Sequence, residues 1–194
     1  EAMDFNILLN NFDLVSLNRY TAGVANDFSG DATFNLTLDG TMKRPQLNGS
    51  IHFSEGAATL SYLNTRYLFS DKVRIYRNNF YFDDFRAEDS FGHGATINGS
   101  VSNSNFRDFY MNLNIDANNI QCMNTGSDDN DVFYGNFFGT GSVGISGRPD
   151  NISLKVNAST EQNTALFLPL YNASEVVSSD FLTFVTHKEV VEDP

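Results

Sequence analysis

The feature that most constrains this chain is an alternation of apolar and polar residues that recurs along most of its length. In the clearest run, the even positions are Ala32, Phe34, Leu36 and Leu38, and the odd positions between them are Thr, Asn, Thr and Asp. Because successive side chains of a strand point to opposite faces, a period of two predicts a half-buried β-strand with one apolar face. The same pattern recurs at Leu47, Ile51 and Phe53, at Ala95, Ile97 and Val101, at 109–117 and at 152–158.

Turn-forming residues separate these runs at intervals of about 8 to 12 residues, which is typical of antiparallel sheets, sandwiches and barrels. Asn78-Asn79 and Asn118-Asn119 are two such separators. Asn48-Gly49 and Asn98-Gly99 are ambiguous, because the alternation continues through both. Each of these Asn-Gly pairs is either a tight turn or a glycine-marked bulge within a strand.

Helical patterns are weak. Segments 5–17 and 173–185 could each form a short amphipathic helix or, equally, a strand. We therefore predict an all-β chain. Since no helices are predicted to cover the sheet, its apolar face must meet the same sheet, a second sheet or a ligand.

The composition excludes some classes of partner. Twelve basic and twenty-four acidic side chains give a net charge of −12, spread along the chain. A nucleic acid is therefore not an expected partner. The same charge opposes docking on anionic lipid headgroups, so we expect any lipid contact to be made through apolar surface.

The chain shows no catalytic or metal-binding motif. Its histidines, His52, His93 and His187, are far apart and lack the spacing of a metal site, so we expect no metal and no cofactor. The acidic run Asp128 to Asp131 lacks the glycine and glutamate positions of a calcium loop and is interpreted as a solvated loop. Cys122, the single cysteine, is interpreted as a buried apolar residue. We expect no enzymatic activity, because no nucleophile, base and orienting group can be named.

Several short motifs follow one another between about residue 31 and residue 170. They are Gly40-Thr41-x-x-Arg44-Pro45-x-Leu47-x-Gly49, Tyr67-x-Phe69-x-Asp71, Val73-x-Ile75, Phe80-x-Phe82, Phe85-x-Ala87, Asp89-x-x-Gly92, Ala95-x-Ile97-x-Gly99, Asn124-Thr125, Phe133-Tyr134-Gly135, Gly139-Thr140-Gly141, Gly147-x-Pro149, Ser159-Thr160, Thr164 and Pro169-Leu170. In the order and spacing of these motifs the chain resembles the C-terminal region of the TamB family in its Bacteroidetes-type form. The resemblance implies a lead-in segment at 1–30, a β domain at 31–170 and a C-terminal segment at 171–194.

The resemblance implies an elongated, bent, largely antiparallel sheet that forms an open apolar groove, called a β-taco. TamB-like proteins resemble AsmA-like and bridge-like lipid-transfer proteins, so the implied ligands are phospholipid acyl chains carried between the inner and outer membranes. On the apolar face, the implied groove lining is Phe34, Leu36, Leu38, Leu47, Ile51, Phe53, Leu60, Phe80, Phe82, Ile97, Val101, Met111, Leu113, Ile115, Val143, Ile145, Leu154 and Val156.

The resemblance also implies a place in the cell. The expected location is the periplasm, with an inner-membrane anchor and an Omp85-class outer-membrane barrel as partner, both engaged through segments outside this sequence.

Two other functions fit the same alternation. One is a closed β-sandwich that binds a carbohydrate or a protein, and the other is a chaperone-like factor for outer-membrane β-barrel or autotransporter assembly.

Overall fold

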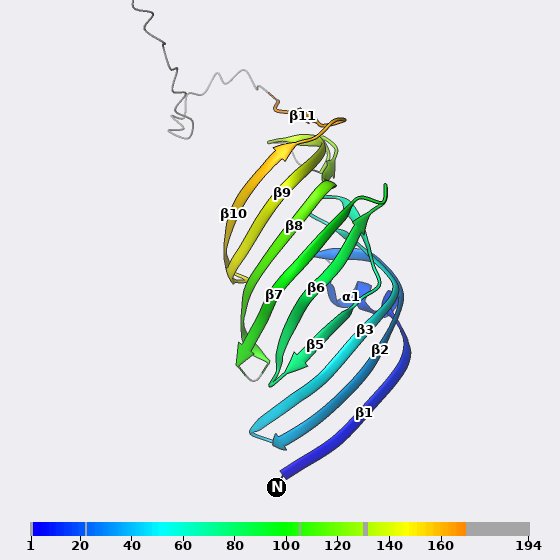
Figure 1. Cartoon of the computed structure of the whole chain (residues 1–194), viewed down its shortest axis with the longest axis vertical. Helices are drawn as coiled ribbons and strands as arrows, with labels where there is room; N and C mark the ends of the chain where they lie inside the picture. The colour runs from blue at the N-terminus through cyan, green and yellow to red at the C-terminus, as the bar shows by residue number, and fades with distance from the viewer. Residues whose placement is uncertain (1, 22, 105, 130–131, 170–194) are drawn as a thin grey trace, which may run out of the picture.

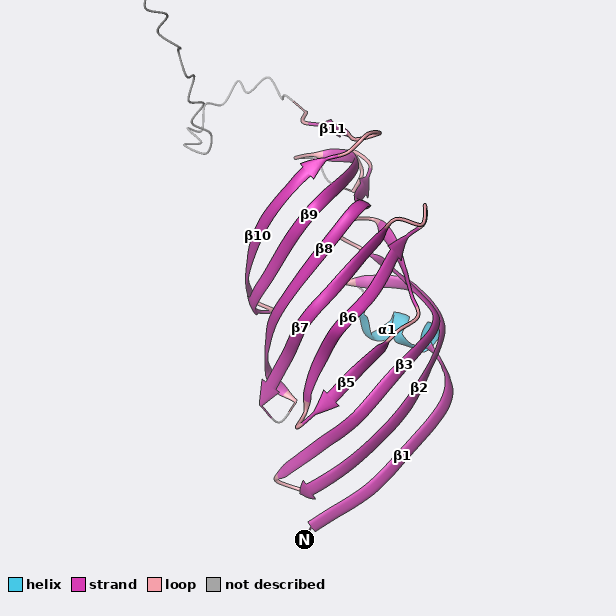
Figure 2. Cartoon of the chain, in the orientation of Figure 1, coloured by secondary structure: helices cyan, strands magenta, loops and turns pink. Residues whose placement is uncertain are grey.

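The computed structural model describes residues 2–21, 23–104, 106–129 and 132–169, and strands make up 76% of them. All strands pair antiparallel in one sheet (Figure 1, Figure 2), so the predicted all-β antiparallel architecture is confirmed. The elements are β1 (Ala2–Asp13), the 3-10 helix η1 (Leu14–Leu17), α1 (Asn18–Thr21), β2 (Ala25–Thr41), β3 (Arg44–Leu60), β4 (Thr65–Phe69), β5 (Lys72–Tyr76), β6 (Asn79–Asp89), β7 (Gly94–Ser104), β8 (Arg107–Thr125), β9 (Tyr134–Arg148), β10 (Asn151–Thr160) and β11 (Ala165–Phe167).

The sheet is a meander in which most strands lie beside the one that precedes them in the chain; β5 and β11 are the exceptions among the described strands, and β11 pairs with β9. Its order is β1-β2-β3-β4-β6-β7-β8-β9-β10. Strand β5 also pairs with both β3 and β6, so β4 and β5 together occupy the place of one interrupted strand. Because all described strands belong to one hydrogen-bonded sheet, the sandwich of two separate sheets is not the architecture seen here.

A line of irregularities crosses the middle of the sheet, and we call it the bulge line. It includes Glu55 in β3 (φ 50°), the break between β4 and β5 at residues 70–71, and Asp84 in β6 (φ 54°). Bulges bend a strand and increase its local twist. Their alignment across neighbouring strands accounts for the curvature of the sheet that Figure 1 shows.

Side chains replace the ladder hydrogen bonds that the bulge line interrupts. The Glu55 N–H donates to Ser70 Oγ at 2.9 Å, and the Arg86 N–H donates to Asp71 Oδ2 at 3.1 Å. The Asp84 N–H donates to Asn98 Oδ1 at 2.9 Å. Backbone groups along the bend therefore keep partners, as a stable sheet requires.

The structure resolves the ambiguity of the two Asn-Gly pairs. Gly49 lies within β3 and Gly99 within β7, with φ of 127° and 129°, so neither pair is a hairpin turn. At Gly49 the neighbouring strand comes so close that an added Cβ would collide with the Asn35 carbonyl and lie 2.9 Å from the Leu36 Cα. Glycine is required here for both its backbone conformation and its lack of a side chain.

We expect Gly49→Ala to lower the free energy of unfolding by about 1 to 3 kcal/mol, because alanine tolerates neither the positive φ nor the contact with β2. Urea denaturation measures this loss. Gly94→Ala is the matched control, since its added Cβ would have Ala87 O at 4.0 Å as its nearest neighbour. Equal stability of the two variants would contradict this account of Gly49.

The ambiguous segment 5–17 is mostly strand. It forms the greater part of β1, and only its last four residues are helical, as η1. Asp13 begins that turn, where its side chain accepts a hydrogen bond from the Val15 N–H at 2.9 Å. Segment 173–185 lies outside the described residues. The expected boundary between residues 30 and 31 falls inside β2.

The sheet curls towards itself at one end. The Tyr67 hydroxyl of β4 donates to the Gln121 carbonyl of β8 at 2.9 Å, and the Asn124 N–H of β8 donates to the Leu63 carbonyl at 2.8 Å. Strands β4 and β8 are not neighbours in the sheet, so these bonds join separate parts of it. Thr65, 1% exposed, belongs to the compact core at this end.

Candidate functional site

The strand register places an unbroken apolar surface on one face of the sheet, and we call it the apolar face. Residues directly opposite each other on antiparallel strands share a face. The pairing can therefore be followed from β1 to β10. One such row is Ile7, Leu36, Gly49, Ile75, Phe80, Val101, Met111, Gly147 and Ile152. The adjacent row is Leu9, Phe34, Ile51, Val73, Phe82, Gly99, Leu113, Ile145 and Leu154.

The structure brings the sequence-predicted lining residues onto this face. Most lie in the two rows above. Ile97, Ile115, Val143 and Val156 form a third row, and Leu38 pairs with Leu47 beside the first row. Phe53 is opposite Ala32 on β2. Leu60 shares the face of Phe69, because residues 56 and 60 of β3 point the same way and Gly56 is opposite Phe69.

This face is only partly covered. Of the predicted lining residues, Leu36 is buried at 9% exposure, whereas Leu60, Leu154 and Val156 are 37%, 61% and 66% exposed. The other members have intermediate burial. A closed sandwich core would bury such residues almost completely. The described strands thus present a wide, partly exposed apolar surface, in which Val73 and Ile75 are buried at 5% and 2% exposure, and exposed apolar surfaces mark binding sites.

Aromatic rings gather on the apolar face at the bulge line. The ring centroid of Phe53 lies 5.3 Å from that of Phe69 and 6.2 Å from that of Phe85, both in edge-to-face geometry. Phe82 lies 5.6 Å from Phe85. Edge-to-face pairs each contribute about 0.5 to 1.5 kcal/mol beyond their burial, so this cluster stabilises the bend.

Sequence reasoning missed several members of the apolar face. Val73 and Ile75 were not predicted as lining residues, although their spacing of two is the same signal that identified the others. Ile7 and Leu9 were missed because segment 5–17 was compatible with a helix. Phe69 and Phe85 could not be placed, because the bulges between them and the regular runs shift the alternation.

The opposite face of the sheet is polar. Arg74 of β5 forms an ion pair with Asp83 of β6 at 3.0 Å, and its guanidinium lies 4.5 Å from the centre of the Tyr81 ring. Asn112, Asn114 and Asp116 on β8 are exposed and alternate with the apolar residues of the same strand. The sheet therefore separates an apolar face from a solvated one.

A second cluster of polar groups surrounds Asp89, which is 2% exposed. Asp89 Oδ1 accepts the N–H groups of Phe91 and His93 at 2.8 and 2.9 Å, and Oδ2 accepts the Gln121 N–H at 2.8 Å. The Nδ1 atom of His93 lies 3.0 Å from Oδ2. One carboxylate therefore joins the β6–β7 connection to β8.

Two opposing effects act on the pKa of Asp89. Burial raises it, but the hydrogen bonds from the N–H groups of Gln121, His93 and Phe91 and from the His93 ring together outweigh burial and hold it below its ordinary value. The Nε2 atom of His93 faces the Asn119 amide at 3.0 Å, not a hydroxyl or a thiol. The arrangement therefore ties strands together and does not activate a nucleophile.

Other candidate groups have structural partners. Burial is the main cause that raises the pKa of the Cys122 thiol, and its Sγ donates to the Ile120 carbonyl at 3.4 Å. Asp129 Oδ2 accepts the Gly126 N–H at 2.7 Å and the Asn64 amide at 3.3 Å, which stabilises a turn. Residues 130 and 131 of the acidic run, and His187, lie outside the described part of the chain. Within that part, no group of three or more His, Cys, Asp or Glu residues is arranged to hold a metal ion.

Comparison with protein families gives a match over more than half of the chain. The model of the TamB C-terminal domain matches residues 83–194. The chain belongs to the TamB family. The match begins in β6 and includes the later strands of the apolar face, so it overlaps much of the region in which the sequence motifs indicated a resemblance.

TamB-family proteins are associated with the cell envelope, and this chain is a TamB-family envelope protein. No curated protein and no solved structure matches it. Among the helices that the structure describes, none has the length and apolar character needed to cross a membrane.

Proposed function

We propose that this TamB-family chain is the periplasmic segment of an envelope-spanning protein, and that its apolar face shelters phospholipid acyl chains during transport between the inner and outer membranes. The observation that carries the proposal is the pair of apolar rows that run from β1 to β10 and remain partly exposed. Family membership supports the place in the envelope.

The energetic need for such a surface is large. The transfer of an acyl chain of about fourteen carbons from a bilayer to water costs a free energy on the order of 10 kcal/mol. Aliphatic and aromatic side chains in contact with the acyl chain restore most of that free energy, because both surfaces leave water together. Neighbouring strands lie about 4.8 Å apart, so each row presents a new residue at that interval, with an apolar side chain at every position except Gly49, Gly99 and Gly147.

The composition of the rows suits movement better than tight binding. They contain Leu, Ile, Val, Phe, Met and Gly, and no charged side chain interrupts them. A site that holds one small molecule usually adds convergent polar groups to an apolar pocket. Without such groups, no position along a row binds an acyl chain much better than the next one, so displacement along the sheet has a low energetic barrier.

The whole protein would complete this function. We propose, as the family resemblance implies, that the full-length protein is anchored in the inner membrane and binds an Omp85-class barrel in the outer membrane. Both contacts would be made by segments outside this sequence. An antiparallel sheet suits a bridge between them, because its ladder satisfies the backbone groups and its edges can continue into further strands.

A role in outer-membrane protein assembly is the second candidate. It is favoured by β10, in which every residue is exposed and Ile152, Leu154 and Val156 are 46%, 61% and 66% exposed. An exposed edge strand with apolar side chains can pair with an incoming strand. The ligand that remains bound after purification distinguishes the two functions: a phospholipid indicates lipid transport, and a polypeptide indicates a role in protein assembly.

We expect the purified chain to retain phospholipid. Mass spectrometry of an organic extract should find phospholipids of several headgroup types, because the apolar face contacts the acyl chains and not the headgroups. A soluble β-protein of similar size, purified from the same cells in the same way, is the control. An extract without phospholipid, or peptides of outer-membrane proteins in its place, would contradict the proposal.

A further inference from the structure

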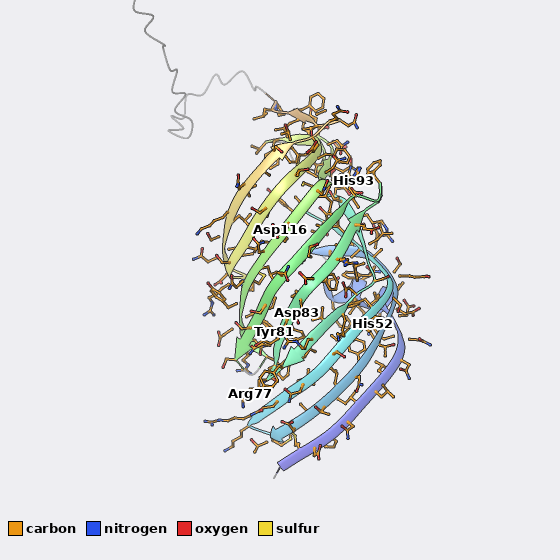
Figure 3. The ribbon with its side chains drawn as sticks, viewed as in Figure 1. His52, Arg77, Tyr81, Asp83, His93 and Asp116 are labelled. Atoms are coloured by element: carbon orange, nitrogen blue, oxygen red, sulfur yellow. The ribbon has the colours of Figure 1, made fainter. Side chains whose placement is uncertain are left out.

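Positive charge gathers at one end of the acidic sheet. Lys43 and Arg44 lie at the turn between β2 and β3, and Arg77 lies at the turn between β5 and β6. All three are exposed. Figure 3 places Arg77 at the lower end of the sheet, far from His93 at the upper end. Arg107, the first residue of β8, adds a fourth exposed cation at the lower end, and the exposed Asp108 beside it is paired with Arg148 at 2.9 Å.

Exposed apolar side chains lie beside these cations. Met42 precedes Lys43 and is 79% exposed, and Tyr76 precedes Arg77 and is 51% exposed. The Arg77 guanidinium lies 5.4 Å from the centre of the Tyr76 ring. Proteins that bind a membrane surface combine these two kinds of side chain, because the apolar part enters the interface while the cation stays at the level of the phosphates.

Asparagine side chains fix the two turns relative to each other. Asn78 is 7% exposed, its Nδ2 donates to the Pro45 carbonyl at 2.9 Å, and its Oδ1 accepts the Leu47 N–H at 2.6 Å. Asn103 of β7 donates in turn to the Asn78 carbonyl at 2.6 Å. The backbones of the two turns that carry the cations are therefore fixed relative to each other, which reduces the entropic cost of binding a ligand between them.

A hollow of about 440 Å³ lies between these turns, and Arg44 and Arg77 both line it. Gln46, Asn103 and Ser104 add hydrogen-bond donors to its wall. Guanidinium groups bind phosphate oxygens through paired, charge-assisted hydrogen bonds. The chemistry of the hollow therefore suits the phosphate of a lipid headgroup.

Nearby acids limit the attraction but do not remove it. Asp39 of β2 is opposite Asp4 of β1, two residues before the end of β2, and it accepts a hydrogen bond from the Asn48 amide at 3.4 Å. Screening restricts the effect of charges to about 8 Å at physiological salt. The local cations therefore govern contact at the turns more than the net charge of −12 does.

We propose that this edge, defined by Met42, Lys43, Arg44, Tyr76 and Arg77, docks on the headgroup layer of a phospholipid bilayer. Met42 and Tyr76 enter the interface, and a lipid phosphate binds between Arg44 and Arg77. The edge is distinct from the apolar face, so this docking site does not depend on the proposed shelter of acyl chains. It would place one end of the sheet against a membrane.

Sedimentation with vesicles tests the docking site. We expect the chain to bind vesicles of equimolar phosphatidylglycerol and phosphatidylcholine, and added salt to weaken binding. The triple variant Lys43→Gln, Arg44→Gln, Arg77→Gln should bind on the order of a hundredfold more weakly, because each cation near an anionic surface contributes about a fivefold effect.

The control triple variant is Lys72→Gln, Arg86→Gln, Lys155→Gln, which removes the same charge from exposed positions on β5, β6 and β10. It should bind nearly as well as the parent, and the lipid content of both purified triple variants should equal that of the parent. Equal losses of vesicle binding in both variants, or no binding by the parent, would overturn the proposal. If the parent binds vesicles as expected but its own extract contains no phospholipid, only the proposed acyl-chain function is overturned.

Discussion

Leu113→Glu is expected to abolish most lipid retention while the chain stays folded. Leu113 lies within the second apolar row, opposite Gly99 on β7 and Ile145 on β9, and its burial is intermediate. Without lipid, a carboxylate at this position can reach water, so the free energy of unfolding should fall by only about 1 kcal/mol. With lipid, an acyl chain would have to cover the charge, which costs several kcal/mol. We expect at least a tenfold loss of extracted phospholipid.

Asn112→Glu is the matched control, because Asn112 is exposed on the opposite face of the same strand and pairs with Ser100 and Ser146. It adds the same charge and should change neither thermal stability nor lipid content. Thermal melting and quantitation of extracted lipid on the three proteins give the answer. If Leu113→Glu unfolds the chain and the parent carries no lipid, the apolar face is a core and the transport function is wrong.

Asp89→Ala should produce the largest loss of stability. It removes the acceptor of the Phe91, His93 and Gln121 N–H groups at the end where the sheet curls towards itself. Each buried N–H left without a partner costs about 1 to 3 kcal/mol. The expected total of about 3 to 6 kcal/mol is a large part of the stability of a typical domain. Urea denaturation measures it, and Asp128→Ala, at an exposed position, is the control.

The pKa of Asp89 adds a dependence on pH to the same experiment. Because the folded-state pKa is lower than the ordinary value, the charged carboxylate stabilises the fold above about pH 4, and this contribution is lost as pH falls further. The difference in urea midpoint between the parent and Asp89→Asn should therefore shrink in acid. A difference that is independent of pH would contradict a role for the charge.

The sequence by itself determined the fold class and indicated which side of many strands is apolar. A period of two has one structural meaning, so runs such as 32–38 and 109–117 specified strands and their apolar faces directly. The short motifs specified the family, since their order and spacing are fixed by the same strands. These signals are local, so they can be interpreted without knowing which strands are neighbours in the sheet.

The effects of the bulges could be read only from the tertiary structure. Asn118-Asn119 was predicted to separate two strands, and this is wrong, because both residues lie at a bulge within β8, where the Asn119 N–H donates to Thr140 Oγ1 of β9. Asn98-Gly99 likewise lies within β7, where the Asn98 side chain bonds to Asp84 of β6. A bulge shifts the alternation by one residue. Residues beyond it, such as Phe85, therefore could not be assigned to a face from the sequence.

Contacts between distant segments were decided by the tertiary structure alone. Asp89 and Gln121 are joined across a curl of the sheet, and Arg44 and Arg77 meet at one hollow because the meander aligns successive turns at one end. Composition gave only the net charge of −12, which does not show that these cations lie together at one edge. Alternation specifies which side of a strand is apolar. Register and curvature decide which side chains meet. Register and curvature both depend on packing between strands that are remote in sequence, so the sequence pattern alone does not give them.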